Sequence, residues 1–146
     1  MASFAKLNDQ NEVLTVLTVS DSDCLDSDNN FSEEVGRQFL ENSTGWTKWK
    51  QTSYNSRHGI YYTPNTTEQD PDQTKLFRGT HASVGMIYDE TNDIFKIKQP
   101  YPSWTWNASS YEWEAPTSKP DNPEPDYYMW DEGSQSWVLH SPEPTA

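Results

Sequence analysis

The hydrophobic and polar residues of this chain alternate in short blocks, and one arrangement of them occurs three times in the C-terminal half. An aromatic residue is followed by Asp or Asn, and a second aromatic residue stands seven places after the first. Asp and Asn accept hydrogen bonds from nearby backbone amides and favour turns, whereas aromatic residues favour strands. Each copy therefore predicts a β-hairpin whose aromatic ends meet across the strands. The copies are Tyr88-Asp89 with Phe95, Trp106-Asn107 with Trp113, and Trp130-Asp131 with Trp137.

Proline-rich links separate the predicted hairpins. Proline fixes its own backbone and favours extended structure, so we expect stiff connections at 99–102 and 115–126. The three hairpins are expected at 81–98, 103–114 and 127–139, with 140–146 as a short tail. In the first hairpin, Gly85 is expected to allow a bulge or a close backbone contact.

The N-terminal residues predict a strand pair followed by one helix. Residues 3–8 and 12–20 have strand character, and the nearly continuous apolar run of the second favours a central strand. Ser32 can cap a helix start, and the acidic residues after it suit the positive end of a helix, so a helix is expected over about 32–42. We expect it to pack across the sheet. Its apolar stripe consists of Phe31, Val35, Phe39 and Leu40.

The residues after the helix predict one more strand and then a long polar loop. Strand character returns over 46–55, whereas 56–80 carries turn signals and at most a short extended piece at Ile60 to Thr63. Long loops with little structure of their own are usually either disordered or functional in compact domains, and this loop is a candidate arm for holding a neighbouring protein. The loop separates the strand pair, helix and strand of 1–55 from the three hairpins of 81–139. Together, residues 1–146 are predicted to form a single α+β domain, mainly β.

Charge and composition restrict the classes of partner. The chain carries a net charge of −13, and such an acidic protein is a poor ligand for nucleic acid, whose binding depends on Lys and Arg at the phosphates. The apolar runs are shorter than the roughly 20 residues that span a bilayer. We therefore expect neither nucleic acid nor membrane as a partner. Because 14% of the residues are aromatic, aromatic rings are expected to supply much of the buried area.

The reactive side chains form no catalytic pattern. The three histidines, His58, His81 and His140, belong to no His-x-x-x-His pair and to no Ser-His-Asp order, and no phosphate-binding glycine loop occurs. With one cysteine, Cys24, a cysteine-rich metal site is excluded. The sequence therefore predicts a protein that is not an enzyme, with no catalytic residues, no metal and no cofactor.

The aromatic residues of the last two hairpins are the candidate binding residues. Trp and Tyr are common anchors of protein interfaces, and stiff proline-rich links lose little entropy on docking. Three roles are open for these rings, namely core, protein interface, and a stacking platform for sugars. The predicted partner-binding residues are Tyr101, Trp104, Trp106, Trp113, Trp130 and Trp137.

Several segments resemble a family of small structural or accessory proteins of tailed bacteriophages, frequent in phages of marine cyanobacteria. The most specific of them is Pro100-Tyr101-Pro102-Ser103-Trp104. The likeness covers nearly the whole chain, except for an insertion-like stretch near Thr63 to Lys75. The other segments that carry it are Phe4–Leu7, Trp49–Asn55, Ala82–Asp89, Tyr128–Glu132 and Trp137-Val138.

The resemblance implies a phage origin and transfers no catalytic residues. We therefore expect a virion protein, made in the host cytoplasm, that binds a capsid or tail protein of the particle or further copies of itself. Head decoration is the first expectation, because a small acidic protein suits many copies on an outer surface. A neck, tail or tail-fibre accessory role is the second. A carbohydrate-binding module for host-surface glycans is the alternative from a different class, and an early intracellular phage protein remains open.

Overall fold

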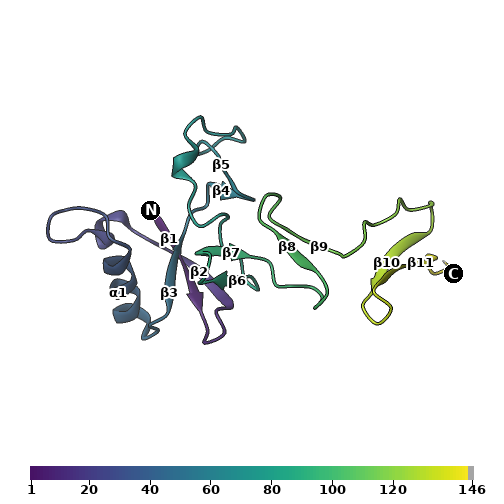
Figure 1. Ribbon diagram of the computed structural model, residues 1–146. Helices are drawn as coiled ribbons and strands as arrows, with labels where there is room; N and C mark the ends of the chain where they lie inside the picture. The colour runs from purple at the N-terminus through teal and green to yellow at the C-terminus, as the bar shows by residue number, and fades with distance from the viewer. Residues whose placement is uncertain (145–146) are drawn as a thin grey trace. The chain divides into compact units, whose positions relative to one another are not determined.

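The predicted α+β fold, mainly β, is confirmed by the computed structural model, which describes residues 1–144 (Figure 1). The chain divides into an N-terminal unit, Met1–Lys98, and a C-terminal unit, Gln99–Ala146. The first predicted hairpin belongs to the N-terminal unit, and the other two form the C-terminal unit.

The N-terminal unit is built on a three-stranded antiparallel sheet in the order β2-β1-β3. Its strands are β1 (Ala2–Leu7), β2 (Val13–Val19) and β3 (Trp49–Thr52). The prediction that 12–20 would be a central strand is wrong, because β1 pairs on both sides and β2 lies at the edge. Leu14 and Leu17 of β2 are accordingly exposed, at 41% and 38%. Apolar runs alone do not separate an edge strand from a central one.

The predicted helix is present as α1 (Glu33–Thr44), and both of its ends are capped. The hydroxyl of Ser32 accepts a hydrogen bond from the amide of Val35 at 3.3 Å. At the other end Gly45 has a φ of 78°, which favours glycine, and its amide donates to the carbonyl of Glu41. The sequence therefore specifies this helix locally at both ends.

The helix packs on the sheet, as predicted, but through a different stripe. Its buried residues are Gly36 and Leu40, whereas Phe31 and Phe39 are 45% and 40% exposed. The apolar stripe predicted from these phenylalanines is thus wrong for all but Leu40 and the half-buried Val35. Gly36 allows the close approach, because a Cβ there would lie 2.6 Å from Phe4 Cζ. The cluster under the helix comprises Ala2, Phe4, Val19, Cys24, Leu40 and Trp49.

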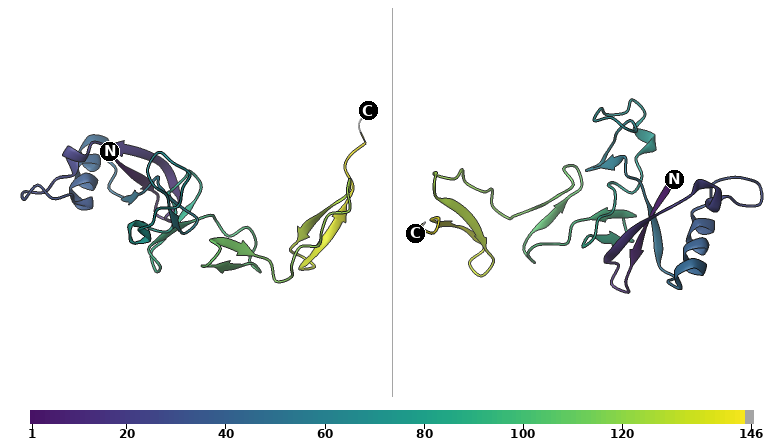
Figure 2. Two further views of the ribbon diagram at one scale, coloured as in Figure 1. Left: turned by 90° about the horizontal axis from the view of Figure 1, so that it is seen from above. Right: turned by 180° about the vertical axis from the view of Figure 1, so that it is seen from behind.

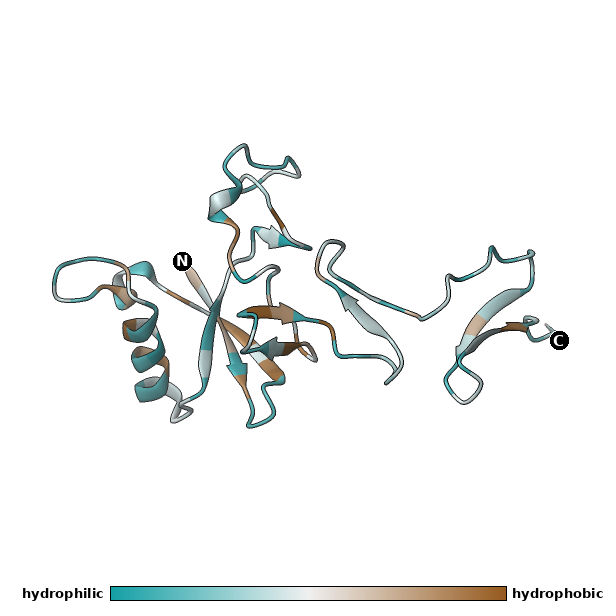
Figure 3. Ribbon diagram, in the orientation of Figure 1, coloured by the Kyte–Doolittle hydropathy of each residue, from teal (hydrophilic) through white to brown (hydrophobic). Residues whose placement is uncertain are grey.

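The opposite face of the sheet is covered by the hairpin of β6 (Ile87–Asp89) and β7 (Ile94–Lys96). The views agree that α1 and this hairpin lie on opposite sides of the sheet (Figures 1 and 2). Alternate side chains of β1 point to the two faces, so Phe4 faces the helix and Ala5 faces the hairpin. Apolar segments gather where these strands meet (Figure 3). The second cluster comprises Ala5, Leu7, Val13, Ala82, Tyr88 and Phe95.

Residues 82–86, predicted as part of the strand entering this hairpin, form a turn instead. Gly85 has a φ of 91°, and its amide donates to the carbonyl of Val13 at 3.0 Å. The amide of Val13 in turn donates to the carbonyl of Met86 at 2.8 Å. The close backbone contact expected at Gly85 is thus confirmed.

The segment 56–80 holds more structure than predicted. It contains the two-residue strands β4 (Ser56–Arg57) and β5 (Ile60–Tyr61), a bridge between Tyr62 and Gln69, and the short helix η2 (Gln73–Lys75). The prediction of at most one extended piece is wrong, because side chains bond the backbone of this segment. The Gln73 amide group accepts from Tyr61 N at 2.9 Å and donates to Tyr61 O at 2.8 Å. A second short helix, η1 (Asp21–Cys24), precedes α1.

The three hairpins of the repeat share one turn. In each hairpin, the residue four places after the Asp or Asn of the repeat has a positive φ. These residues are Asp93 at 52°, Tyr111 at 56° and Gln135 at 49°. The Asx carboxyl or amide oxygen accepts from backbone amides inside the turn. The aromatic ends pair directly across the strands, with ring centroids 5.3, 5.4 and 5.3 Å apart. The predicted aromatic-ended hairpins are therefore confirmed in all three copies.

The C-terminal unit consists of two such hairpins. The first pairs β8 (Thr105–Asn107) with β9 (Glu112–Glu114), and the second pairs β10 (Tyr127–Asp131) with β11 (Ser136–His140). Within residues 99–144, Trp130 is the single buried residue, at 8% exposure. This unit therefore has a core of one side chain with half-buried rings around it.

Candidate functional site

Four of the six predicted binding residues form one aromatic cluster in the C-terminal unit. Trp104 lies at its centre, with its ring 5.4 Å from Tyr101, 5.8 Å from Trp130 and 6.0 Å from Trp137. Trp130 is buried, whereas the other three rings are half-buried. The cluster thus divides the predicted residues into one core member and three that keep accessible area.

Glu132 joins the Pro-Tyr-Pro-Ser-Trp segment of this cluster to the last hairpin through hydrogen bonds. Its carboxylate accepts from Trp130 Nε1 at 2.8 Å, and from the amide and hydroxyl of Ser103 at 3.1 and 2.7 Å. The hydrogen bond from Trp130 is the largest influence, and together with those from Ser103 it lowers the pKa of Glu132. The ionised carboxylate therefore holds Ser103, next to Trp104, against the turn of the last hairpin.

Trp106 and Trp113 form a second cluster with Tyr111. The ring of Trp106 lies 5.7 Å from Tyr111 and 5.4 Å from Trp113, both edge to face. Burial raises the pKa of Tyr111. All three rings are half-buried, so the second cluster also presents aromatic area to its surroundings.

A cavity of about 430 Å³ is lined by residues of both clusters, Trp104, Trp113 and Trp137. The proline-rich link 115–126 forms another wall, and Trp137 Nε1 donates to the carbonyl of Thr117 at 2.8 Å. Lys119 of this link places its Nζ 5.8 Å from the centre of the Trp137 ring. Glu112 and Glu114 also line the cavity. Aromatic faces beside carboxylates can bind a cation, or stack on a sugar and hydrogen-bond its hydroxyl groups.

Sequence reasoning identified the three tryptophans of this cavity but not its charged residues. Glu112 and Glu114 flank Trp113 in the strand, which is a local signal that could have been used. Lys119 carries no local signal, because its place depends on how the link folds back towards Trp137. Tyr111, which completes the second cluster, lies in the predicted turn of the second hairpin.

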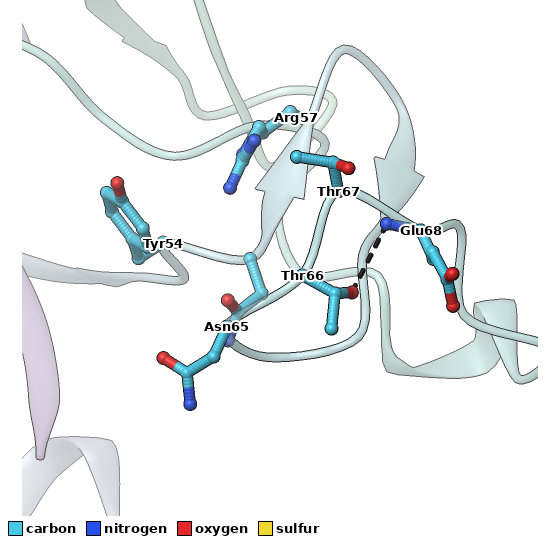
Figure 4. A pocket seen from close by; sticks show the side chains of 7 residues that line it. Tyr54, Arg57, Asn65, Thr66, Thr67 and Glu68 are labelled. Atoms are coloured by element: carbon cyan, nitrogen blue, oxygen red, sulfur yellow. Dashed lines mark hydrogen bonds between the residues drawn. The ribbon is translucent and has the colours of Figure 1, made fainter.

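A second cavity, of about 600 Å³, lies in the N-terminal unit (Figure 4). Its central cation is Arg57, whose guanidinium lies 5.6 Å from the ring of Tyr54 and 5.1 Å from that of Tyr62. Polar side chains of 65–68 form the opposite wall, where Thr66 Oγ1 accepts from the amide of Glu68 at 3.2 Å. The arrangement suits a small polar group. None of the predicted site residues lies here.

Within residues 1–144, no group of three or more His, Cys, Asp or Glu side chains is arranged to hold a metal ion. No helix in the described part of the chain has the length and apolar character needed to cross a membrane.

The comparisons with known proteins gave no match: no protein-family model, no curated protein and no solved structure matches this chain.

Proposed function

We propose that this protein is a non-enzymatic structural protein of a tailed-bacteriophage particle, and that the aromatic clusters of its C-terminal unit bind a major protein of that particle. The observation that carries the proposal is the small core of this unit. Within residues 99–144 Trp130 alone is buried, while the other five predicted residues remain half-buried. A unit with this distribution gains apolar burial when another surface covers it.

The magnitude of that gain suits a protein interface. A Trp or Tyr side chain can bury roughly 150–250 Å², and each of the five rings keeps less than about a third of its area exposed, so together they would still offer on the order of 250 Å². A stable interface needs about 800 Å² from each partner, so the rings would supply about a third of it. The outer face of the last hairpin can add more, because Met129 and Val138 pair across the strands there and are 50% and 38% exposed.

The links support the same role. The prolines of 115–126 limit the conformations of the free chain, so less entropy is lost when this segment docks. The assignment to a phage particle draws on the resemblance of Pro100–Trp104 and the other segments to tailed-phage proteins. Head decoration is the preferred location, and the neck, tail or tail fibre is the second.

Mass spectrometry of purified particles tests this function. The protein should be present, with a copy number near that of the major capsid protein for head decoration, or near that of tail components for a tail role. Particles that lack the protein while infected cells contain it would contradict the proposal and favour an early intracellular role.

Glycan binding on the host surface is the second candidate function, and the cavity with three tryptophans is the observation that favours it. It predicts that Trp113→Ala abolishes retention on an immobilised host polysaccharide while the hairpins stay folded. Trp46→Ala, in the N-terminal unit, is the matched control and should be retained like the natural protein. Equal retention of both variants would exclude the cavity as a sugar site.

A further inference from the structure

We propose that the cavity lined by Trp104, Trp113 and Trp137 receives a Lys or Arg side chain of the partner protein. This inference rests on the proposed function, because it specifies the chemistry of the surface that the C-terminal unit binds. Its first support is the lining of the cavity, which combines three tryptophans with two acidic residues, Glu112 and Glu114. Indole faces attract cations, and Trp is the strongest of the aromatic side chains in this respect.

The second support is Lys119, which already places an ammonium group at the wall of this cavity. Its Nζ lies 5.8 Å from the centre of the Trp137 ring, within the range of a cation–π interaction. The chain therefore uses this aromatic face for a cation of its own. The Lys119 ammonium group stands at the end of a flexible side chain and can be displaced. A partner cation would therefore compete with Lys119 for the face of the Trp137 ring.

The third support is the charge around the cavity. Lys119 is the single Lys or Arg among residues 101–146, which carry eight acidic residues. Two of the acids, Glu112 and Glu114, line the cavity itself, and Glu114 accepts from Asn107 Nδ2 at 2.7 Å. Such a surface repels anionic partners and attracts basic ones, and the cavity gives a basic side chain a defined place to bind.

The test uses the purified full chain and two short capped peptides, one alternating glycine with lysine and the other alternating glycine with glutamine. Binding is followed by tryptophan fluorescence and by calorimetry at low salt. We expect the lysine peptide to bind and the glutamine peptide not to bind. Equal binding of both peptides would overturn the proposal. Binding of a neutral oligosaccharide in place of the lysine peptide would overturn it in favour of a glycan site.

Variants give changes of opposite sign. Lys119→Met removes the competing cation and should tighten binding of the lysine peptide about threefold. The double variant Glu112→Gln, Glu114→Gln should weaken it about fivefold or more. The matched control is Glu124→Gln with Glu143→Gln, which removes the same charge from exposed residues outside the cavity lining. If this control weakens binding as much as the cavity variant, the attraction is general and the cavity is not the site.

A failure here is distinguishable from a failure of the proposed function. If the protein is found in purified particles but the lysine peptide does not bind, the virion role stands and the cation site is wrong. If Lys119→Met weakens binding, Lys119 belongs to the contact and does not compete with it, which also overturns the cation site.

Discussion

Arg78 donates hydrogen bonds to both carboxylate oxygens of Glu33, although 45 residues separate Arg78 from Glu33 in the sequence. The distances are 2.6 Å from Nη1 to Oε1 and 3.0 Å from Nη2 to Oε2. Glu33 opens α1, and Oε1 also accepts the amide of Gln51 in β3 at 2.8 Å. Arg78 further donates to the Gln51 carbonyl at 2.8 Å and to Asp93 Oδ1, in the β6–β7 turn, at 2.8 Å. One guanidinium therefore joins the layers of the N-terminal unit.

Replacing Arg78 by Met should destabilise the N-terminal unit by about 2–3 kcal/mol, because it removes one partner of a largely buried ion pair and leaves the other unpaired. The Arg78 side chain is only 10% exposed, while Glu33 at 32% recovers part of its solvation. Urea unfolding followed by the helix signal of circular dichroism measures the change. A midpoint equal to that of the natural protein would contradict it.

Arg37→Met is the matched control for Arg78→Met. Arg37 bonds Glu34 and Glu41 along the surface of α1, and these carboxylates are 60% and 38% exposed. Exposed ion pairs contribute at most about 1 kcal/mol, so this variant should lose far less stability than Arg78→Met. Similar losses in the two variants would mean that burial is not what makes the Arg78 pair important.

The stability of the N-terminal unit should fall at alkaline pH through Tyr88. Burial, followed by the hydrogen bond to Asp93, raises the pKa of Tyr88 to about 12 from 10.0. Because the folded pKa lies above the unfolded one, this contribution is complete below pH 10.0 and is lost as the pH rises to about 12. Across that window the loss is about 2 kcal/mol.

Tyr88→Phe isolates the contribution of the Tyr88 hydroxyl. At pH 9 the variant should be less stable by about 1 kcal/mol, since it lacks the hydrogen bond to Asp93. The difference should reach zero near pH 11 and favour the variant by about 1 kcal/mol near pH 12, because the natural protein loses about 2 kcal/mol over this range and Phe does not ionise. Urea unfolding at both pH values measures it, and an unchanged difference would contradict the assigned ionisation.

Gly36→Ala should destabilise the N-terminal unit by up to about 2 kcal/mol, because overpacking of α1 against the sheet usually costs about 1–3 kcal/mol. The added Cβ would lie 2.6 Å from Phe4 Cζ and 2.8 Å from Cys24 Sγ. The gain of about 1 kcal/mol in helix propensity opposes this cost. Gln38→Ala, on the exposed side of α1, is the control and should change the free energy of unfolding by less than about 0.5 kcal/mol. A more stable Gly36→Ala variant would show that Phe4 can move aside.

The features that the sequence predicts correctly are those formed by neighbouring residues. The hairpin turns depend on an Asx side chain and amides two or three places later, as at Asp89 with Thr91 and Asn92. The ends of α1 likewise depend on Ser32 and Gly45. Such contacts join residues only a few places apart in the sequence, so the local residue pattern is enough to predict them.

The features that the sequence misses depend on distant partners. β1 is central only because β3, more than forty residues later, pairs with its free edge. The structure of the segment 56–80 depends on Gln73, whose side chain hydrogen-bonds the backbone of Tyr61, 12 residues away. The cavity was missed for the same reason, since its wall at Lys119 forms where Trp137 bonds Thr117, 20 residues away. Hydrophobic patterning carries no information on these polar contacts.

Trp130 and Trp113 are both aromatic ends of repeat hairpins, the first of one copy and the second of another, but they should respond differently to truncation. Trp130 is 8% exposed, packs against Trp104 and Trp137, and bonds Glu132, so Trp130→Ala should cost the C-terminal unit about 3–5 kcal/mol. Trp113 is half-buried beside the cavity, and Trp113→Ala should cost about 1 kcal/mol.

Limited proteolysis and near-ultraviolet circular dichroism should therefore show an unfolded C-terminal unit only in Trp130→Ala. The far-ultraviolet helix signal should stay unchanged in both variants, because α1 belongs to the N-terminal unit. Equal protease resistance of the two variants would mean that Trp130 is a surface residue and that all six predicted aromatic residues are available for binding.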